Sequence, residues 1–515
     1  MEKKPFAELQ CDVGNADHVV QYPLAFYDDR KNYNRKTVLK KGEKKLFNGI
    51  INLYSYNKLF FAGGGRRAYR MKMIQVGETG ERKGKDLRKV LSYRWVVWGI
   101  MVFAFMVVFF HRFAAAVVKD DLTGDFALSA ASFGTMASMY FYAYMIMQIP
   151  VGFLADSLGA RITVSLGMFL AGAGSILFGF APTALWLFIG RFIVGIGVST
   201  VFVSIMKVQS QWFREREFAT ISGATTLVGN AGGIISQGPL AFLISIVSWR
   251  LGFVGIGFFT LFIAVLCAIY IRNRPQDMGL PPLNEREIAV ASLLPVKFSP
   301  WTGLKEVLAA KGILATMSFY LFNQAGFFAL VGTWGIPWLV NVYALSVQDA
   351  SSYSVYLILG IMTGGFLTGW VSDRLGRRKM PMIASALLHV LLWSVLVFWG
   401  SGKPPLSFVK ILFFLLGVSN TAFVLAWSVA KELTPRNYTG LAISVLNAAG
   451  FLSIAILTSV FGVVLDFHKT LPVAEAYRTA FFLPLAGAAL SFFSALFVPE
   501  TGGGRAHTDK FEETV

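Results

Sequence analysis

An arginine and a histidine interrupt an otherwise apolar run in "FFHRFAAAVV", residues 109–118. Ionisable side chains are expensive at membrane depth, so those that occur there usually serve a function. The planar guanidinium of Arg112 can hold a carboxylate or a phosphate through two hydrogen bonds at once. His111 changes charge near neutral pH, which makes it a candidate for proton coupling. The pair predicts a binding site for a small anion.

Uncharged polar side chains lie in the other apolar runs. Those predicted to share the binding site with Arg112 and His111 are Tyr140, Tyr144, Gln148, Asn323, Gln324, Trp334, Asn420, Trp427 and Asn447. Asn230 and Gln237 are further candidates of this kind. Tyr140 and Tyr144 share a helix face because they are four residues apart, although simple packing would give the same spacing.

The central portions of the apolar runs contain no Asp or Glu. An arginine without an acidic counter-ion at that depth favours an anionic ligand. Arg191, the other arginine within a run, suits either bracing between helices or contact with the substrate. His389 is not expected to be a ligand. No metal cluster, nucleophile–base pair or phosphate-binding loop is present in the sequence, so we expect no metal, no cofactor and no enzymatic activity.

Two charged loops repeat at a fixed offset. "GFLADSLGARI" (152–162) and "GWVSDRLGRRK" (369–379) are 217 positions apart, and Asn230 and Asn447 share this offset. Glycines permit a tight turn, and an aspartate can cap the following helix. We expect these loops to form a breakable latch between two halves, whereas the simpler alternative is that their charges only fix topology. The latch residues are Gly152, Asp156, Gly159, Arg161, Gly369, Asp373, Arg374, Gly376, Arg377 and Arg378.

Long apolar helices must position these residues. The chain has 515 residues, 55% hydrophobic and only 15% charged, whereas soluble proteins carry about 25% charged residues. Runs of about 20 apolar residues can each cross a bilayer. The twelve predicted spans are 95–118, 129–152, 162–181, 184–206, 220–247, 250–271, 312–339, 350–371, 380–400, 406–431, 437–465 and 476–498. The fold class is therefore all-α integral membrane, with two pseudo-symmetric six-helix bundles.

The net charge of +18 reflects topology. Sixteen Lys and Arg residues lie in the short and central loops on the side of the two glycine–aspartate loops, against six on the opposite side. Because cytoplasmic loops carry the positive excess, we expect both termini to be cytoplasmic in a multi-pass protein of the cytoplasmic membrane. The partners are then the lipid bilayer and a small anion, with no nucleic acid, and we expect a monomer.

Composition also divides the chain. Residues 1–93 are polar and predict a disordered cytoplasmic extension, with the alternative that translation starts at Met71 or Met73. The bundles occupy 94–271 and 312–498. Between them, 272–311 is a cytoplasmic linker that ends in a short surface helix, and 499–515 forms a tail.

The loop Gly369-x-x-x-Asp373-Arg374-x-Gly376-Arg377-Arg378 closely resembles the signature of the major facilitator superfamily. "GRFIVGIGVS" (190–199) resembles its fourth-helix arginine motif, and "PETGGG" (499–504) a common ending. The resemblance covers about residues 94–500 and implies secondary transport by alternating access. The linker "RNRPQDMGLPP" is similar to that of organophosphate:phosphate antiporters, which pair a helix 1 arginine with one in helix 7. Helix 7 has no arginine here, and helix 1 also resembles that of anion:cation symporters.

These observations predict a transporter of a small organic anion, a carboxylate or a sugar phosphate. The coupled species is a proton, sodium or a counter-anion. Two alternatives are a drug or metabolite efflux antiporter, supported by Gly238-Pro239, and a transporter-like membrane sensor without net flux.

Overall fold

The computed structural model describes residues 65–283, 300–435 and 438–501. The chain divides into two compact units, Met1–Glu81 and Arg82–Val515, and the second holds every helix after α2. The described residues are helical with connecting turns, and they contain no strand. Twelve helical segments among them are long and apolar enough to cross a membrane, which confirms the predicted spans and the all-α fold.

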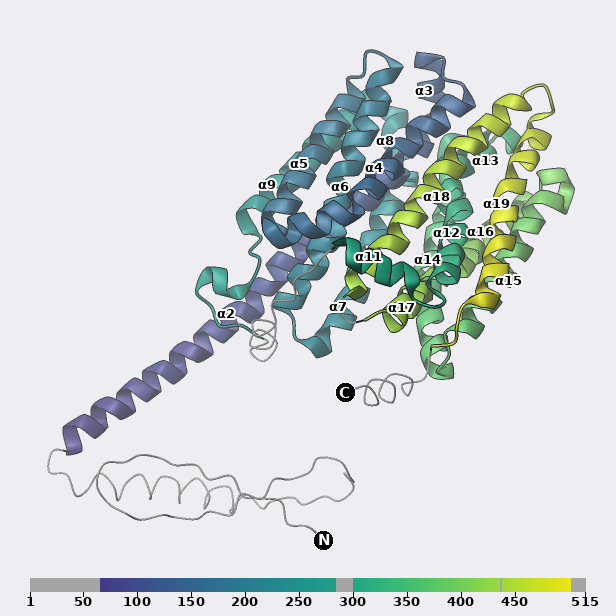
Figure 1. Cartoon of the computed structure of the whole chain (residues 1–515). Helices are drawn as coiled ribbons and strands as arrows, with labels where there is room; N and C mark the ends of the chain where they lie inside the picture. Colours follow the sequence, from purple (N-terminus) through teal and green to yellow (C-terminus); the bar gives the residue numbers. More distant parts are fainter. Residues whose placement is uncertain (1–64, 284–299, 436–437, 502–515) are drawn as a thin grey trace, which may run out of the picture. The chain divides into compact units, whose positions relative to one another are not determined.

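The first six spans form one bundle of the second unit (Figure 1). Its elements in chain order are α2 (Gly65–Phe113), η1 (Ala114–Val118), α3 (Lys119–Phe126), α4 (Ala130–Ser157), α5 (Ala160–Gly179), α6 (Ala184–Trp212), α7 (Glu215–Ile235), α8 (Gly238–Ile246) and α9 (Trp249–Tyr270). Span 1 is Asp86–Phe126, which comprises the later part of α2 with η1 and α3, and span 5 is Thr220–Ile246, formed by α7 and α8.

The last six spans form the second bundle (Figure 1). Its elements are α12 (Ile313–Ala329), η3 (Leu330–Trp334), α13 (Gly335–Tyr343), α14 (Val347–Leu375), α15 (Lys379–Phe398), η4 (Trp399–Gly402), α16 (Leu406–Asn420), α17 (Phe423–Leu433), α18 (Thr439–Phe467) and α19 (Val473–Phe497). Glycines bring helices close inside the bundles: a Cβ on Gly417 would lie 2.7 Å from Gly360 Cα. Such small residues are typical of helix contacts in membranes.

The link between the bundles contains two short helices, η2 (Pro275–Met278) and α11 (Pro300–Ala309). The second overlaps the segment 301–311, for which the sequence predicts a short helix before span 7. It lies against the second bundle, where a Cβ on Gly303 would meet the ring of Tyr438 at 2.7 Å.

The prediction for the N-terminal extension is partly wrong. Residues 1–64 lie outside the described residues, but α2 begins at Gly65, within the segment 1–93 predicted to be disordered. The physical reason is helix propagation. Once the first span is helical, each added residue gains a backbone hydrogen bond without a new nucleation cost. Polar composition alone therefore does not end the helix.

Spans 1 and 7 are both broken near their middle. Span 1 changes from α2 to the 3₁₀ segment η1 at Ala114, and span 7 contains the π-helical segment η3. The sequence offset of 217 carries Ala114 to position 331, which lies inside η3. Irregular turns inside long helices often mark functional positions. Equivalent breaks in the two halves support the internal repeat and point to the space between the bundles.

Candidate functional site

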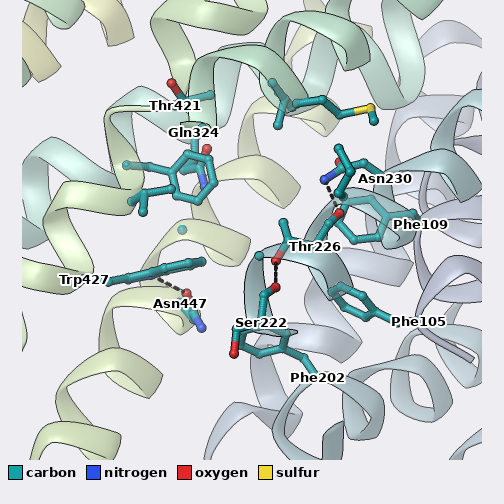
Figure 2. A pocket seen from close by; sticks show the side chains of 18 of the residues that line it. Phe105, Phe109, Phe202, Ser222, Thr226, Asn230, Gln324, Thr421, Trp427 and Asn447 are labelled. Carbon is teal, nitrogen blue, oxygen red and sulfur yellow. Dashed lines mark hydrogen bonds between the residues drawn. The ribbon is translucent and has the colours of Figure 1, made fainter. Parts of the chain in front are cut away.

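A cavity of about 700 Å³ lies between the two bundles. Its lining extends from Phe218, in the first turn of α7, to Arg112 at the break in span 1. Both bundles contribute polar and aromatic side chains, which face one another across the cavity (Figure 2). The lining residues used below are Phe109, Arg112, Tyr144, Asn230, Tyr320, Gln324, Phe328, Trp427, Asn447 and Phe451.

Arg112 is the single charged side chain among the described lining residues. It is 7% exposed, and the ion pairs found in the described part of the chain leave it without an acidic partner. Four aromatic rings surround its guanidinium carbon instead, at 4.7–5.9 Å, two from each bundle: Phe109, Tyr144, Phe328 and Phe451. Ring faces attract the cation without neutralising it. The positive charge therefore remains available to an anion.

The backbone around Arg112 is fixed by two neighbouring helices. Arg191 of α6 donates from Nη1 to the carbonyl oxygen of His111 at 2.7 Å, and the Tyr140 hydroxyl donates to the carbonyl of Val108 at 3.1 Å. Carbonyls near a break in a helix need such partners when they are buried. The structure thus gives Arg191 a bracing contact with span 1, and Arg191 does not line the cavity.

His111 lies outside the cavity, in contrast to its neighbour Arg112. It is 1% exposed, and its Nε2 is 3.2 Å from the hydroxyl of Thr260 on α9, within its own bundle. Successive helical residues point about 100° apart because a turn has 3.6 residues. The orientation of α2 about its own axis therefore places Arg112 in the cavity and His111 against α9.

Of the two tyrosines predicted on α4, only one lines the cavity. Tyr144 lines the cavity, and its ring centroid is 4.1 Å from that of Phe451 across the two bundles. Tyr140, one turn earlier, is fully buried and bonded to span 1. Gln148 also lies outside the lining, with Nε2 donating to the Tyr144 carbonyl at 3.3 Å.

Span 7 places only one of its three predicted polar residues in the cavity, Gln324. Asn323 accepts hydrogen bonds from Asn420 Nδ2 at its carbonyl (3.0 Å) and at its side-chain oxygen (3.2 Å), so this pair ties α12 to α16. The Trp334 indole donates to the Thr458 carbonyl at 3.1 Å. None of these three residues lines the cavity: Asn323 and Asn420 pack within the second bundle, and Trp334 also contacts the ring of Phe133 on α4 of the first bundle.

Asn447 has a fixed orientation in the cavity wall. Its Oδ1 accepts from the Tyr320 hydroxyl at 2.8 Å and from the Trp427 indole at 3.1 Å, the latter drawn in Figure 2. Because both donors meet the oxygen, the amide nitrogen is the end left to face other groups. Tyr320 and the phenylalanines around Arg112 also line the cavity, although no sequence pattern predicts this.

Two amide oxygens in the lining have no hydrogen-bond partner, Asn230 Oδ1 and Gln324 Oε1. Both side chains are nearly buried, at 3% and 4% exposed, and they come from opposite bundles (Figure 2). Asn230 Nδ2 donates to the Thr226 carbonyl at 2.8 Å, which fixes the oxygen as the free end. Buried acceptors of this kind require donors.

A family model described as Major Facilitator Superfamily matches residues 100–458 and 336–513, which together span most of the chain. The chain belongs to the Major Facilitator Superfamily. It is therefore a multi-pass membrane transporter and not an enzyme.

The chain is also similar to known transporters and to a solved structure. The hexuronate transporter of Bacillus subtilis is 27% identical over 344 residues, 64% of this chain and 76% of that protein. The probable galactarate/D-glucarate transporter GudP of the same organism is 26% identical over 389 residues, 70% and 83% of the two chains. A bacterial homologue of the human lysosomal transporter Spinster, crystallised inward-facing and unoccupied, shares the fold: TM-score 0.62 at 17% identity, covering 79% and 98%.

The two glycine–aspartate loops, 152–162 and 369–379, form their side-chain contacts within their own bundles in this structure. Asp156 pairs with Lys207 at 2.7 Å, and Arg161 donates from Nε to the Ala268 carbonyl at 2.8 Å. In the second bundle, Arg378 contacts Asp373 at 2.6 Å and Glu432 at 3.5 Å. Burial lowers the pKa of Arg378, but these two carboxylates outweigh it and hold that pKa above its usual value.

The remaining latch residues lie beside these pairs. Gly159 and Gly376 have φ of +82° and +61°, the left-handed region that glycine adopts readily, at the two turns. Arg374 lies over the ring of Trp370 at 5.3 Å. Gly152 and Gly369 have open space where a Cβ would be, and Arg377 donates its backbone N–H to the Ser372 carbonyl at 3.3 Å.

Glu217 forms a further carboxylate contact at the start of α7. It accepts from the Arg94 guanidinium and from the Arg214 backbone N–H, each at 3.0 Å. Burial raises the pKa of Glu217, but these two donors outweigh it, so the pKa lies below its usual range. Its stabilisation is therefore complete above the pKa of the unfolded chain and is lost as pH falls through the folded-state pKa.

Proposed function

We propose that this transporter carries a small hydroxylated organic anion by alternating access, with Arg112 as its anchor. One observation supports this most directly: a nearly buried guanidinium is the single charge among the described cavity residues. Such a group can hold a carboxylate or phosphate through two hydrogen bonds. Two relatives are named as a hexuronate transporter and a probable galactarate/D-glucarate transporter, which agrees with a carboxylate substrate.

The unpartnered amide oxygens of Asn230 and Gln324 support the hydroxylated character of the anion. An amide oxygen accepts hydrogen bonds and cannot donate them, so it suits substrate hydroxyls and is a poor partner for a second carboxylate. The amide nitrogen of Asn447, on the wall of the second bundle, suits an acceptor oxygen of the same molecule. An anion without hydroxyls would leave the two buried acceptors unsatisfied, which costs binding free energy.

We also propose that the two glycine–aspartate loops and both termini face the cytoplasm, in the cytoplasmic membrane of the cell. The excess of Lys and Arg on that side supports this orientation. The cavity lining reaches Phe218, in the first turn of α7 on the same side, so the state described is then inward-open. Both bundles and the whole cavity belong to one chain, which is consistent with transport by a monomer.

The test is counterflow into proteoliposomes that contain the purified full chain. We expect uptake of radiolabelled D-glucuronate to exceed uptake of an unsubstituted carboxylate of similar size, such as hexanoate, by more than tenfold. Binding of D-glucuronate without any flux would indicate a sensor instead. Flux of cationic drugs without anion flux would indicate an efflux antiporter.

The loop residues are proposed to form a latch that exchanges partners during the cycle. Asp373 is 71% exposed, so its contact with Arg378 adds little stability but can favour one state. We expect Asp373→Asn to slow D-glucuronate transport by about two- to fivefold with normal membrane insertion. The matched control is Asp277→Asn, which removes a carboxylate paired with Arg274 at 3.1 Å in the linker between the bundles. An unchanged transport rate in Asp373→Asn would leave the loop charges a role in topology alone.

A further inference from the structure

The two bundles touch directly along α4 and α18 (Figure 1). A Cβ on Gly134 would lie 2.6 Å from the Thr458 carbonyl oxygen, and a Cβ on Gly462 would overlap the carbonyl of Ala130. Glycine at these positions lets the two backbones approach closely. This contact lies at the start of α4 and the end of α18, on the side of the unit opposite the glycine–aspartate loops.

Polar contacts cross the same boundary. The hydroxyl oxygen of Ser138 on α4 lies 2.8 Å from the Ala455 carbonyl and accepts from the Ser459 hydroxyl at 3.0 Å. A carboxylate also forms hydrogen bonds across this boundary. Asp466, near the end of α18, accepts from the backbone N–H of Ala130 at 2.9 Å and of Ala131 at 2.8 Å.

These two N–H groups are the first of α4, where a helix has no internal acceptors and its dipole is positive. An N-cap side chain satisfies only one of these groups, at the second or third residue of the helix. Here Ser129 is the N-cap, and its hydroxyl accepts from the backbone N–H of Ser132, the third residue of α4. Asp466 supplies the missing acceptor from the other bundle, 336 residues from Ala130 along the chain. This cap can exist only while the two bundles are in contact on this side.

We infer that Asp466 is a gate residue, whose carboxylate holds the transporter closed on the side opposite the glycine–aspartate loops. Opening of that side separates α4 from α18, so both hydrogen bonds must break, and the first N–H groups of α4 must find water instead. A contact made in one state and absent from the other shifts the equilibrium toward the state that contains it. Removing the carboxylate should therefore populate the state that is open on the side opposite the glycine–aspartate loops.

The test measures access to the cavity with a single cysteine. Cys11 is replaced by serine and Cys267 by alanine in the full chain, and Met362, a cavity-lining residue, is replaced by cysteine. A membrane-impermeant maleimide is applied to intact cells and, separately, to everted vesicles, so that each membrane face is probed in turn. We expect Asp466→Ala to increase the rate of labelling from the face opposite the loops by about fivefold to thirtyfold. Asp466→Asn should give a smaller increase, because the amide keeps one acceptor oxygen.

The matched control is Asp349→Asn. Asp349 lies in the first turn of α14, on the same side as Asp466, but its carboxylate accepts from Ser346 of its own bundle at 2.7 Å. We expect no change in labelling for this variant. A single symmetric peak in size-exclusion chromatography of each purified variant shows that it is folded. The inference is overturned if folded Asp466→Ala and Asp466→Asn label at the parental rate, or if Asp349→Asn labels as fast as Asp466→Ala. The measurement uses no substrate, so a failure of the proposed anion transport would not affect it.

Discussion

Arg112→Ala is expected to weaken D-glucuronate binding by roughly tenfold to a hundredfold or more. The alanine variant loses the single charge among the described cavity residues and with it the charge-assisted hydrogen bonds to the carboxylate, of which one alone contributes about 1.5–3 kcal/mol. Arg112→Lys should recover little, because an ammonium keeps the charge but lacks the planar fork. The measurement is competition of unlabelled D-glucuronate for transport, supported by ligand-induced thermal stabilisation of the purified protein.

The control for this experiment is Arg250→Ala. Arg250 also lies over aromatic rings, Trp249 at 4.5 Å and Phe126 at 5.3 Å, but it is outside the cavity and pairs with Asp125 at 3.3 Å. Its loss should reduce stability without changing affinity. Equal affinities for Arg112→Ala and the parent protein would show that Arg112 braces the bundle and does not bind the anion.

The fold could be predicted from the sequence because hydropathy reports directly on the environment of each helix. Apolar runs of the length of a bilayer must be helices, since the bilayer offers no partners to backbone groups. The internal offset of 217 then gave two equivalent halves, and the breaks at Ala114 and Leu330 obey nearly the same offset. The helix from Gly65 was missed because a polar segment carries no signal for propagation from its neighbour.

The cavity itself was predictable only in part. Arg112 could be identified because an arginine in an apolar run is rare, and its cost requires compensation. The choice between His111 and Arg112 depends on helix rotation, which hydropathy does not determine when the helix is apolar on every face. Asn323 and Gln324 pose the same problem one residue apart: the first ties α12 to α16, and the second lines the cavity. Phe109 and Phe451 carry no signal at all among 47 phenylalanines.

Asn447→Asp is expected to weaken D-glucuronate binding near neutral pH by about a hundredfold. The aspartate can still accept from Tyr320 and Trp427, so the local geometry is retained. It replaces the donor nitrogen with an anionic oxygen in a cavity whose substrate is itself an anion. That change removes one hydrogen bond and adds repulsion, and the new carboxylate also competes with the substrate for Arg112.

The pH dependence separates charge from shape in this variant. The new carboxyl is charged at neutral pH and becomes neutral as pH falls through its pKa, so binding should recover at acidic pH, whereas Asn447→Ala should show no such recovery. Asn341→Asp is the matched control, because Asn341 also bonds a tyrosine, Tyr477 at 3.1 Å, but lies outside the cavity lining. The measurement is the affinity for D-glucuronate of Asn447→Asp, Asn447→Ala and Asn341→Asp as a function of pH. A pH-independent loss in Asn447→Asp, equal to that in Asn447→Ala, would mean that Asn447 only positions Tyr320 and Trp427 and that the anion binds elsewhere in the cavity.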